Sequence, residues 1–66
     1  MIIIVNGEQK DVAAGTTLQA LLDSLELDGS TLVVQRNDDI IEQADYGQVA
    51  LDERDQVELV RFVGGG

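Results

Sequence analysis

The chain has 66 residues, with 13 Asp and Glu against 4 Lys and Arg, and it contains no His, Cys, Trp or Pro. A chain of this length forms one small domain with a limited core, so an enzyme with its own deep pocket is not expected. The missing His and Cys exclude an imidazole base, a thiol nucleophile and the usual zinc ligands, and the formal charge of −9 disfavours nucleic acid and anionic membranes as partners.

The longest apolar run covers residues 1–5, which is far shorter than the roughly 20 residues of a membrane-spanning helix. No basic stretch precedes this run, so it does not have the pattern of a secretory signal. The absence of cysteine fits the reducing cytoplasm. We therefore expect a cytoplasmic protein. Its acidic charge indicates either a protein partner with a basic docking surface or only a charge that keeps a small protein soluble.

Residues 2–5 are apolar and largely β-branched, which predicts a strand. Asn6 and Gly7 follow directly, and both tolerate the positive φ angles of a type I′ hairpin turn. We expect a second strand at 9–12. Because the first strand is apolar on both faces, we expect it to lie inside a sheet.

Residues 16–19 have the spacing of a capping box, in which the Thr16 hydroxyl accepts from the Gln19 backbone N–H and the Gln19 side chain reaches back. Four leucines then fall on one stripe of a helix: Leu18, Leu21, Leu22 and Leu25. Asp28 and Gly29 close the segment. The pattern predicts an amphipathic helix of about three turns that covers one face of a small sheet.

The second half of the chain alternates short strands and turns. We expect strands at 31–35, 40–41, 48–51 and 56–63, a turn at 36–39, an irregular loop with one helical turn at 42–47, and a charged turn at 52–55. This order predicts an α+β fold in which a mixed sheet of four to five strands wraps one helix. The first and last strands are the most apolar, and we expect them to pair in parallel at the centre.

Two acidic clusters are candidates for cation binding: Asp38 with Asp39, and the group of Asp52, Glu53 and Asp55. A calcium loop needs alternating ligands, a central glycine and a terminal Glu, and neither cluster has that order. Both clusters fall in predicted turns. We interpret them as solvated turn residues.

The remaining polar candidates have structural explanations. Gly15 and Gly29 lack the spacing and the lysine of a phosphate-binding loop. Tyr46 has no base near it in the sequence, so we interpret it as a packed loop residue. Arg36 and Arg61 are expected to form weak exposed ion pairs on an acidic surface.

The last strand leads directly into residues 64–66, which are all glycine. Val57 and Leu59 suit the core, whereas Val60 and Phe62 alternate with them and are expected on the outside. Three extended glycines carry the terminal carboxylate roughly 10 Å from the domain and fit a channel too narrow for side chains. The alternative is a frayed end or a cloning remnant. A carboxylate reacts only after activation, for which an acyl-adenylate made by an ATP-binding partner is the most plausible route.

Over its whole length the chain resembles the ThiS family of sulfur carriers, which belongs to the ubiquitin-like β-grasp proteins that end in Gly-Gly. The matching residues are Ala14-Gly15-Thr16, Arg36-Asn37 before Ile40-Ile41, Tyr46, Asp55 and, most specifically, the run from Val60 to Gly66. The resemblance implies a β-grasp domain at 1–63 and a flexible glycine tail at 64–66. It also implies a carrier that other enzymes act on, not an enzyme, and no bound cofactor.

The resemblance implies that Gly66, with Gly65 before it, is the end that reacts. A ThiF-type, E1-like adenylyltransferase would use ATP to adenylate Gly66. A persulfide donor of the cysteine desulfurase type would supply sulfur, and the resulting thiocarboxylate would pass it to a ThiG-type thiazole synthase. Val60, Phe62, Val63 and Gly64 would contact the partner. Three alternatives stay open: a MoaD-like small subunit of molybdopterin synthase, a ubiquitin-like protein modifier, and an interaction module with an inert tail.

Overall fold

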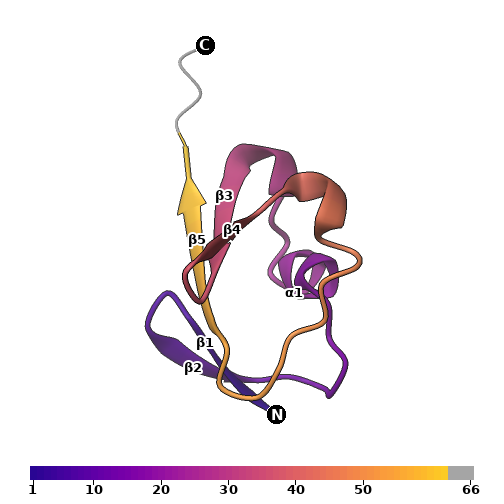
Figure 1. Ribbon diagram of the computed structural model, residues 1–66, viewed down its shortest axis with the longest axis vertical. Coiled ribbons are helices and arrows are strands. Elements are labelled where there is room, and N and C mark those ends of the chain that lie inside the picture. Colours follow the sequence, from indigo (N-terminus) through magenta and orange to yellow (C-terminus); the bar gives the residue numbers. More distant parts are fainter. Residues whose placement is uncertain (63–66) are drawn as a thin grey trace.

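The computed structural model describes residues 1–62, which form a five-stranded mixed sheet with one α-helix against it (Figure 1). The strands are β1 (Ile2–Val5), β2 (Glu8–Asp11), β3 (Leu32–Arg36), β4 (Asp39–Ile41) and β5 (Gln56–Arg61), in the order β2-β1-β5-β3-β4. The helix α1 covers Leu18–Ser24, and 3₁₀ turns lie at Gly29–Thr31 and Gln43–Asp45. The expected α+β architecture is therefore confirmed.

The first and last strands pair in parallel, as predicted, and the other neighbours are antiparallel. The Ile4 N–H donates to the Asp55 carbonyl and the Asn6 N–H to the Val57 carbonyl, both at 2.9 Å. The Asn6 side chain then continues the pairing, because its Oδ1 accepts from the Leu59 N–H at 2.8 Å and its Nδ2 donates to the Leu59 carbonyl at 3.3 Å. One amide side chain thus holds β5 beyond the end of β1.

The β1–β2 hairpin has the predicted turn. Asn6 has φ 49° and Gly7 has φ 84°, so both central residues take the positive values that a type I′ turn requires. The turn places Glu8 opposite Val5, so β2 begins and ends one residue earlier than predicted.

The helix begins one residue later than predicted. Thr17 is the N-cap, and its Oγ1 accepts from the Ala20 N–H at 3.1 Å. The predicted capping box is wrong, because the Thr16 hydroxyl donates to a backbone oxygen three residues earlier and the Gln19 side chain donates forward along the helix. The Thr16 carbonyl accepts from the Leu51 N–H at 2.8 Å, which ties this residue to a distant segment and leaves the cap to Thr17.

The helix also ends earlier than the leucine spacing predicts. Glu26 has φ 57°, and its N–H donates to the Asp23 carbonyl at 3.0 Å, while the Leu27 N–H donates to the Leu22 carbonyl at 2.9 Å. These are the two hydrogen bonds of a Schellman motif, which stops a helix. Helix α1 therefore has seven residues and ends at Ser24. Within residues 1–62, no helix has the length and apolar character needed to cross a membrane.

The chain between β4 and β5 is less regular than predicted. The expected helical turn is present at Gln43–Asp45, but residues 48–51 form no strand and make one isolated bridge, between Ala50 and Thr17. The prediction for 48–51 is therefore wrong, because this segment pairs with the residue before the helix and not with a strand of the sheet. Strand β3 lies one residue later than predicted, and β5 ends at Arg61 within the described residues.

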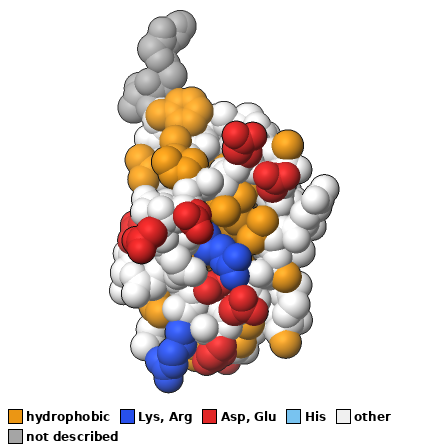
Figure 2. Space-filling view, viewed as in Figure 1, with side chains coloured by type: hydrophobic (Ala, Val, Ile, Leu, Met, Phe, Trp, Pro, Cys, Tyr) orange, Lys and Arg blue, Asp and Glu red, His pale blue; other side chains and the backbone are white. Residues whose placement is uncertain are grey.

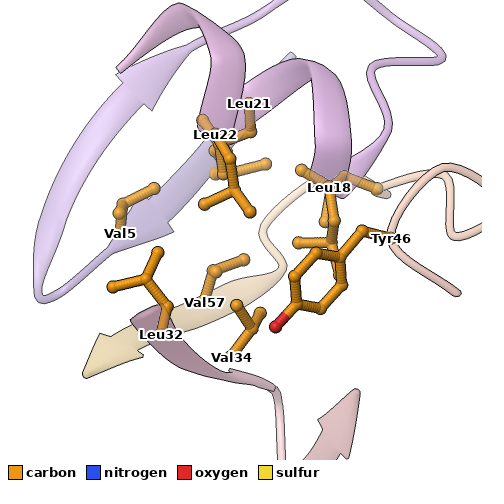
Figure 3. Close-up of a cluster of buried hydrophobic side chains, with 10 residues drawn as sticks. Val5, Leu18, Leu21, Leu22, Leu32, Val34, Tyr46 and Val57 are labelled. Atoms are coloured by element: carbon orange, nitrogen blue, oxygen red, sulfur yellow. The ribbon is translucent and has the colours of Figure 1, made fainter. Parts of the chain in front are cut away.

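The core lies between α1 and the inner face of the sheet. Figure 3 shows Leu18, Leu21 and Leu22 pointing from the helix toward side chains on the strands. Tyr46 is 2% exposed and lies beside Leu18, which confirms that it is a packed loop residue, and burial raises the pKa of its phenol. The buried hydrophobic residues are Ile3, Val5, Leu18, Leu21, Leu22, Leu32, Val34, Tyr46, Leu51 and Val57.

Gly29 is required by the close approach of Tyr46. A Cβ added at Gly29 would lie 2.9 Å from the Tyr46 ring, which has no room to move within the core. We expect Gly29→Ala to lower the free energy of unfolding by about 1–3 kcal/mol. The matched control is Gly47→Ala, whose Cβ would meet no atom within 4 Å. Urea denaturation compares the two variants, and equal stabilities would contradict this packing.

Candidate functional site

Strand β5 presents different side chains to its two faces near the end of the described chain. Val57 is fully buried and Leu59 packs partly against the core, whereas Val60 is 56% exposed and Phe62 is 49% exposed. Val60 and Phe62 therefore lie on the outside, as expected. Figure 2 shows hydrophobic side chains gathered at one end of the molecule.

The exposed apolar surface of β5 extends across the neighbouring strands. Val33 of β3 is 38% exposed and pairs with Val60, so the two side chains share the outer face. Ile40 of β4 is 70% exposed and pairs with Gln35, two residues along the same face from Val33. We call Val33, Ile40, Val60 and Phe62 the outer apolar patch. Such grouped exposure is typical of a docking surface.

Val33 and Ile40 were not among the candidates from the sequence. Residues 32–34 are all apolar, so hydrophobicity alone does not separate the exposed Val33 from the buried Leu32 and Val34 on either side of it. No local signal places Ile40, because β4 has three residues and its register comes from pairing with β3. The other predicted residues, Val63 and 64–66, lie outside the described residues, and their roles stay predictions.

A buried carboxylate, that of Asp55, joins the turn before β5 to β3. Asp55 is 6% exposed, and its Oδ2 accepts from the Arg36 Nε at 2.7 Å and from the Asp52 N–H at 2.8 Å. Its Oδ1 accepts from the Asn37 Nδ2 at 3.3 Å, and Arg36 also donates to the Asp52 carboxylate at 2.9 Å. We call these four residues the Asp55 cluster. It fixes the turn from which β5 begins.

The Asp55 cluster corrects two expectations from the sequence. Asp55 is not a solvated turn residue, and its ion pair with Arg36 is not a weak exposed one, because β3 brings the Arg36 side chain over the turn. The ion pair of Arg36 with Asp52 is exposed on the Asp52 side, as expected. The other acidic side chains of both clusters are exposed, as expected. Residues 1–62 contain no group of three or more acidic, His or Cys side chains suited to a metal ion.

The charge of Asp55 is stabilised by its hydrogen bonds. Burial alone would raise the pKa of Asp55, but the hydrogen bonds from the Asp52 backbone, Arg36 and Asn37 outweigh it and hold the pKa below its usual value. The same contact with Asp55 raises the pKa of Arg36. The pair is therefore ionised at neutral pH. We assign it a structural role, since no buried side-chain nitrogen or oxygen within residues 1–62 lacks a hydrogen-bond partner.

Known proteins of the same family resemble the chain in sequence and in fold. The model of the ThiS family matches residues 3–66. The chain belongs to the ThiS family. The sulfur carrier protein ThiS of Bacillus subtilis is 46% identical over 50 residues, which cover 76% of each chain. The crystal structure of the thiamine biosynthesis protein ThiS from Geobacter metallireducens superimposes with a TM-score of 0.86 at 28% identity and covers 100% of both chains. The fold is thus the ubiquitin-like β-grasp that the resemblance implied.

A larger protein also contains a segment similar to this ThiS-family chain. The thiazole synthase of Paramagnetospirillum magneticum is 39% identical over 66 residues, which cover 100% of this chain and 20% of that protein. The chain therefore spans about one fifth of the length of the thiazole synthase that it matches.

The Asp55 cluster predicts a pH-dependent contribution to stability. Because the pKa of Asp55 is lower in the folded state, its contribution is present above the unfolded pKa of about 3.9 and is lost as the pH falls through the folded pKa. We expect Asp55→Asn to lower the free energy of unfolding by about 1–3 kcal/mol at pH 7. The difference from the unmodified protein should shrink below about pH 4, where Asp55 gains a proton. Urea denaturation at several pH values measures this, and a difference independent of pH would contradict the assignment.

Proposed function

We propose that this chain is a sulfur carrier for the synthesis of the thiazole ring of thiamine, with the carboxylate of Gly66 as the group that carries sulfur. The observation on which the proposal rests is the match to the ThiS family, which extends through Gly66. The exposed end of β5 supports it, because this strand leads toward residues 64–66. The chain is then a co-substrate, and we assign the catalysis to its partners.

The chemistry starts from an unreactive carboxylate. An E1-like adenylyltransferase of the ThiF type joins the Gly66 carboxylate to the α-phosphorus of ATP and releases pyrophosphate. The terminal sulfur of a persulfide, from a cysteine desulfurase type of donor, then attacks the carbonyl carbon and AMP leaves. A thiol cleaves the resulting S–S bond and frees the thiocarboxylate. Glycines at 64–66 suit this sequence, because a bare backbone enters a narrow active site without steric clash.

The outer apolar patch is the surface that we assign to the activating enzyme. Val60 and Phe62 lie four and two residues before Gly64, so a partner that binds them also holds the tail near its own active site. We expect Val63 and Gly64 to extend this contact. The charge of −9 favours a partner whose docking surface is basic.

We assign the recipient of the sulfur as a thiazole synthase. The similarity to the Paramagnetospirillum magneticum thiazole synthase supports this, because that protein includes a segment like the whole of this chain. Joining a carrier to its acceptor in one polypeptide keeps the two at a high effective concentration. The adenylating partner and the persulfide donor use ATP and free thiols, so we place the reaction in the cytoplasm.

Removal of the last glycine tests the tail. We expect the full chain, incubated with a ThiF-type enzyme, ATP and a persulfide donor, to gain the mass that replaces one oxygen by sulfur. The variant that lacks Gly66 should show no such gain, and its circular dichroism should be unchanged. Intact-mass spectrometry measures the mass of the full chain and of the variant. Sulfur on the shortened chain would overturn the assignment, and ladders of conjugates would indicate a protein modifier instead.

The same assay identifies the recipient. The loaded chain is mixed separately with a ThiG-type thiazole synthase and with the large subunit of a molybdopterin synthase. We expect loss of the added sulfur mass with the thiazole synthase alone. Transfer to the molybdopterin enzyme alone would replace this recipient with the MoaD-type alternative.

Replacement of Phe62 tests the outer apolar patch. We expect Phe62→Ala to weaken binding to the activating enzyme by at least about tenfold, since exposed aromatic anchors dominate many interfaces. Its free energy of unfolding should fall by less than about 1 kcal/mol, because the side chain is half exposed. Leu22→Ala, in the core, should instead lose about 2–5 kcal/mol. Calorimetric titration and urea denaturation measure the two quantities, and unchanged affinity would exclude the patch as the docking surface.

A further inference from the structure

A second concave surface lies on the opposite side of β5 from the outer apolar patch. This groove has a volume of about 590 Å³, and hydrophobic side chains from four segments line it: Val5, Leu25, Leu27, Leu32 and Leu59. The Schellman motif opens it, because α1 stops at Ser24 and the inner face of the sheet continues beyond the helix. Leu25 and Leu27 line the groove from the chain that follows the helix.

Two cationic side chains line this groove, on the same face of the sheet as the buried core. Lys10 pairs with Ile3, and Arg61 pairs with Leu32. Because Ile3 and Leu32 are buried against the helix, Lys10 and Arg61 point to the same inner side. Neither cation forms a salt bridge within residues 1–62.

The charge at the groove differs in sign from that of the remaining molecule. The groove is lined by Lys10, Arg61 and one acidic residue, Glu8, which gives a local formal charge of +1. The remaining side chains comprise 2 of the 4 basic residues and 12 of the 13 acidic ones, a formal charge of −10. Salt screens distant charges over about 8 Å, so a small ligand in the groove responds mainly to the local charge.

We propose that this groove binds a peptide segment of a partner protein in which apolar side chains flank a single carboxylate. The leucines receive the apolar side chains, and Arg61, which pairs with Leu32 and lies two residues from Leu59, receives the carboxylate. Lys10 lies farther along the rim, two residues from Glu8, and adds positive charge to the groove. The open shape favours a segment of a protein over an enclosed small ligand, and one carboxylate suits a rim whose net charge is small. A strongly acidic segment is repelled by the remaining surface. This proposal rests on the groove alone and is independent of the sulfur chemistry.

The groove and the outer apolar patch use opposite faces of the same strand end. Leu59 and Arg61 face the groove, whereas Val60 and Phe62 face outward. A partner that occupies the groove therefore leaves the outer apolar patch accessible. The carrier then contacts two proteins at the same time, or one protein on both sides of the strand that leads to residues 64–66.

NMR titration of the full chain tests this inference with three blocked tripeptides. We expect acetyl-Leu-Glu-Leu-amide to shift the methyl signals of Leu25, Leu27 and Leu59. Acetyl-Leu-Lys-Leu-amide and acetyl-Ser-Glu-Ser-amide should give no shifts there. The double variant Lys10→Gln with Arg61→Gln should bind the first peptide roughly tenfold more weakly or worse, because it removes the charge-assisted hydrogen bonds to the carboxylate.

Arg54→Gln is the matched control, since it removes a cation that does not line the groove. Its affinity for the first peptide should equal that of the unmodified chain. Equal shifts with the lysine peptide, shifts confined to Val60 and Phe62, or no shift with any peptide would overturn the proposal. The titration uses no ATP, enzyme or sulfur donor, so its failure leaves the carrier proposal standing, and failure of sulfur loading leaves this inference standing.

Discussion

The parallel pairing of β1 with β5 is the contact on which the remaining structure depends. It joins the two ends of the chain at the centre of the sheet, so it forms only after a loop of about 50 residues has closed, at a cost in chain entropy. The backbone register covers two residue pairs, and the Asn6 amide extends it to Leu59. On the other side, five residue pairs join β5 to β3. The central strand is thereby fixed from both edges.

This position gives the two faces of β5 different uses. Near the start of the strand the inner face is covered by α1 and buries Val57. Beyond the end of the helix the same face borders the groove, while the outer face carries exposed apolar side chains. A seven-residue helix is shorter than the sheet it covers, and this difference in length creates the second surface. The helix stop at Glu26 thus has a consequence for binding as well as for folding.

The few basic residues of this acidic chain are divided between structure and surface. Arg36 is held by Asp52 and Asp55, where it stabilises the turn that starts β5. Lys10 and Arg61 lie at the groove and make no such internal pairs within the described chain. A protein of net charge −9 has a surface that repels carboxylates, so the position of each cation determines where an anion can bind.

The sequence by itself determined the features that follow from neighbouring residues. They are the Asn6-Gly7 turn, the leucine stripe, and the outward Val60 and Phe62. These features come from local backbone preference and from spacings of two to four residues. The glycine end and the family resemblance were also readable in the chain alone. Contacts between distant residues decided the others: the Thr17 cap, the absence of a strand at 48–51, the burial of Asp55, and the position of Lys10 and Arg61 on one groove. Each of these depends on which segments lie side by side, and that arrangement is set by the free energy of packing the whole chain at once.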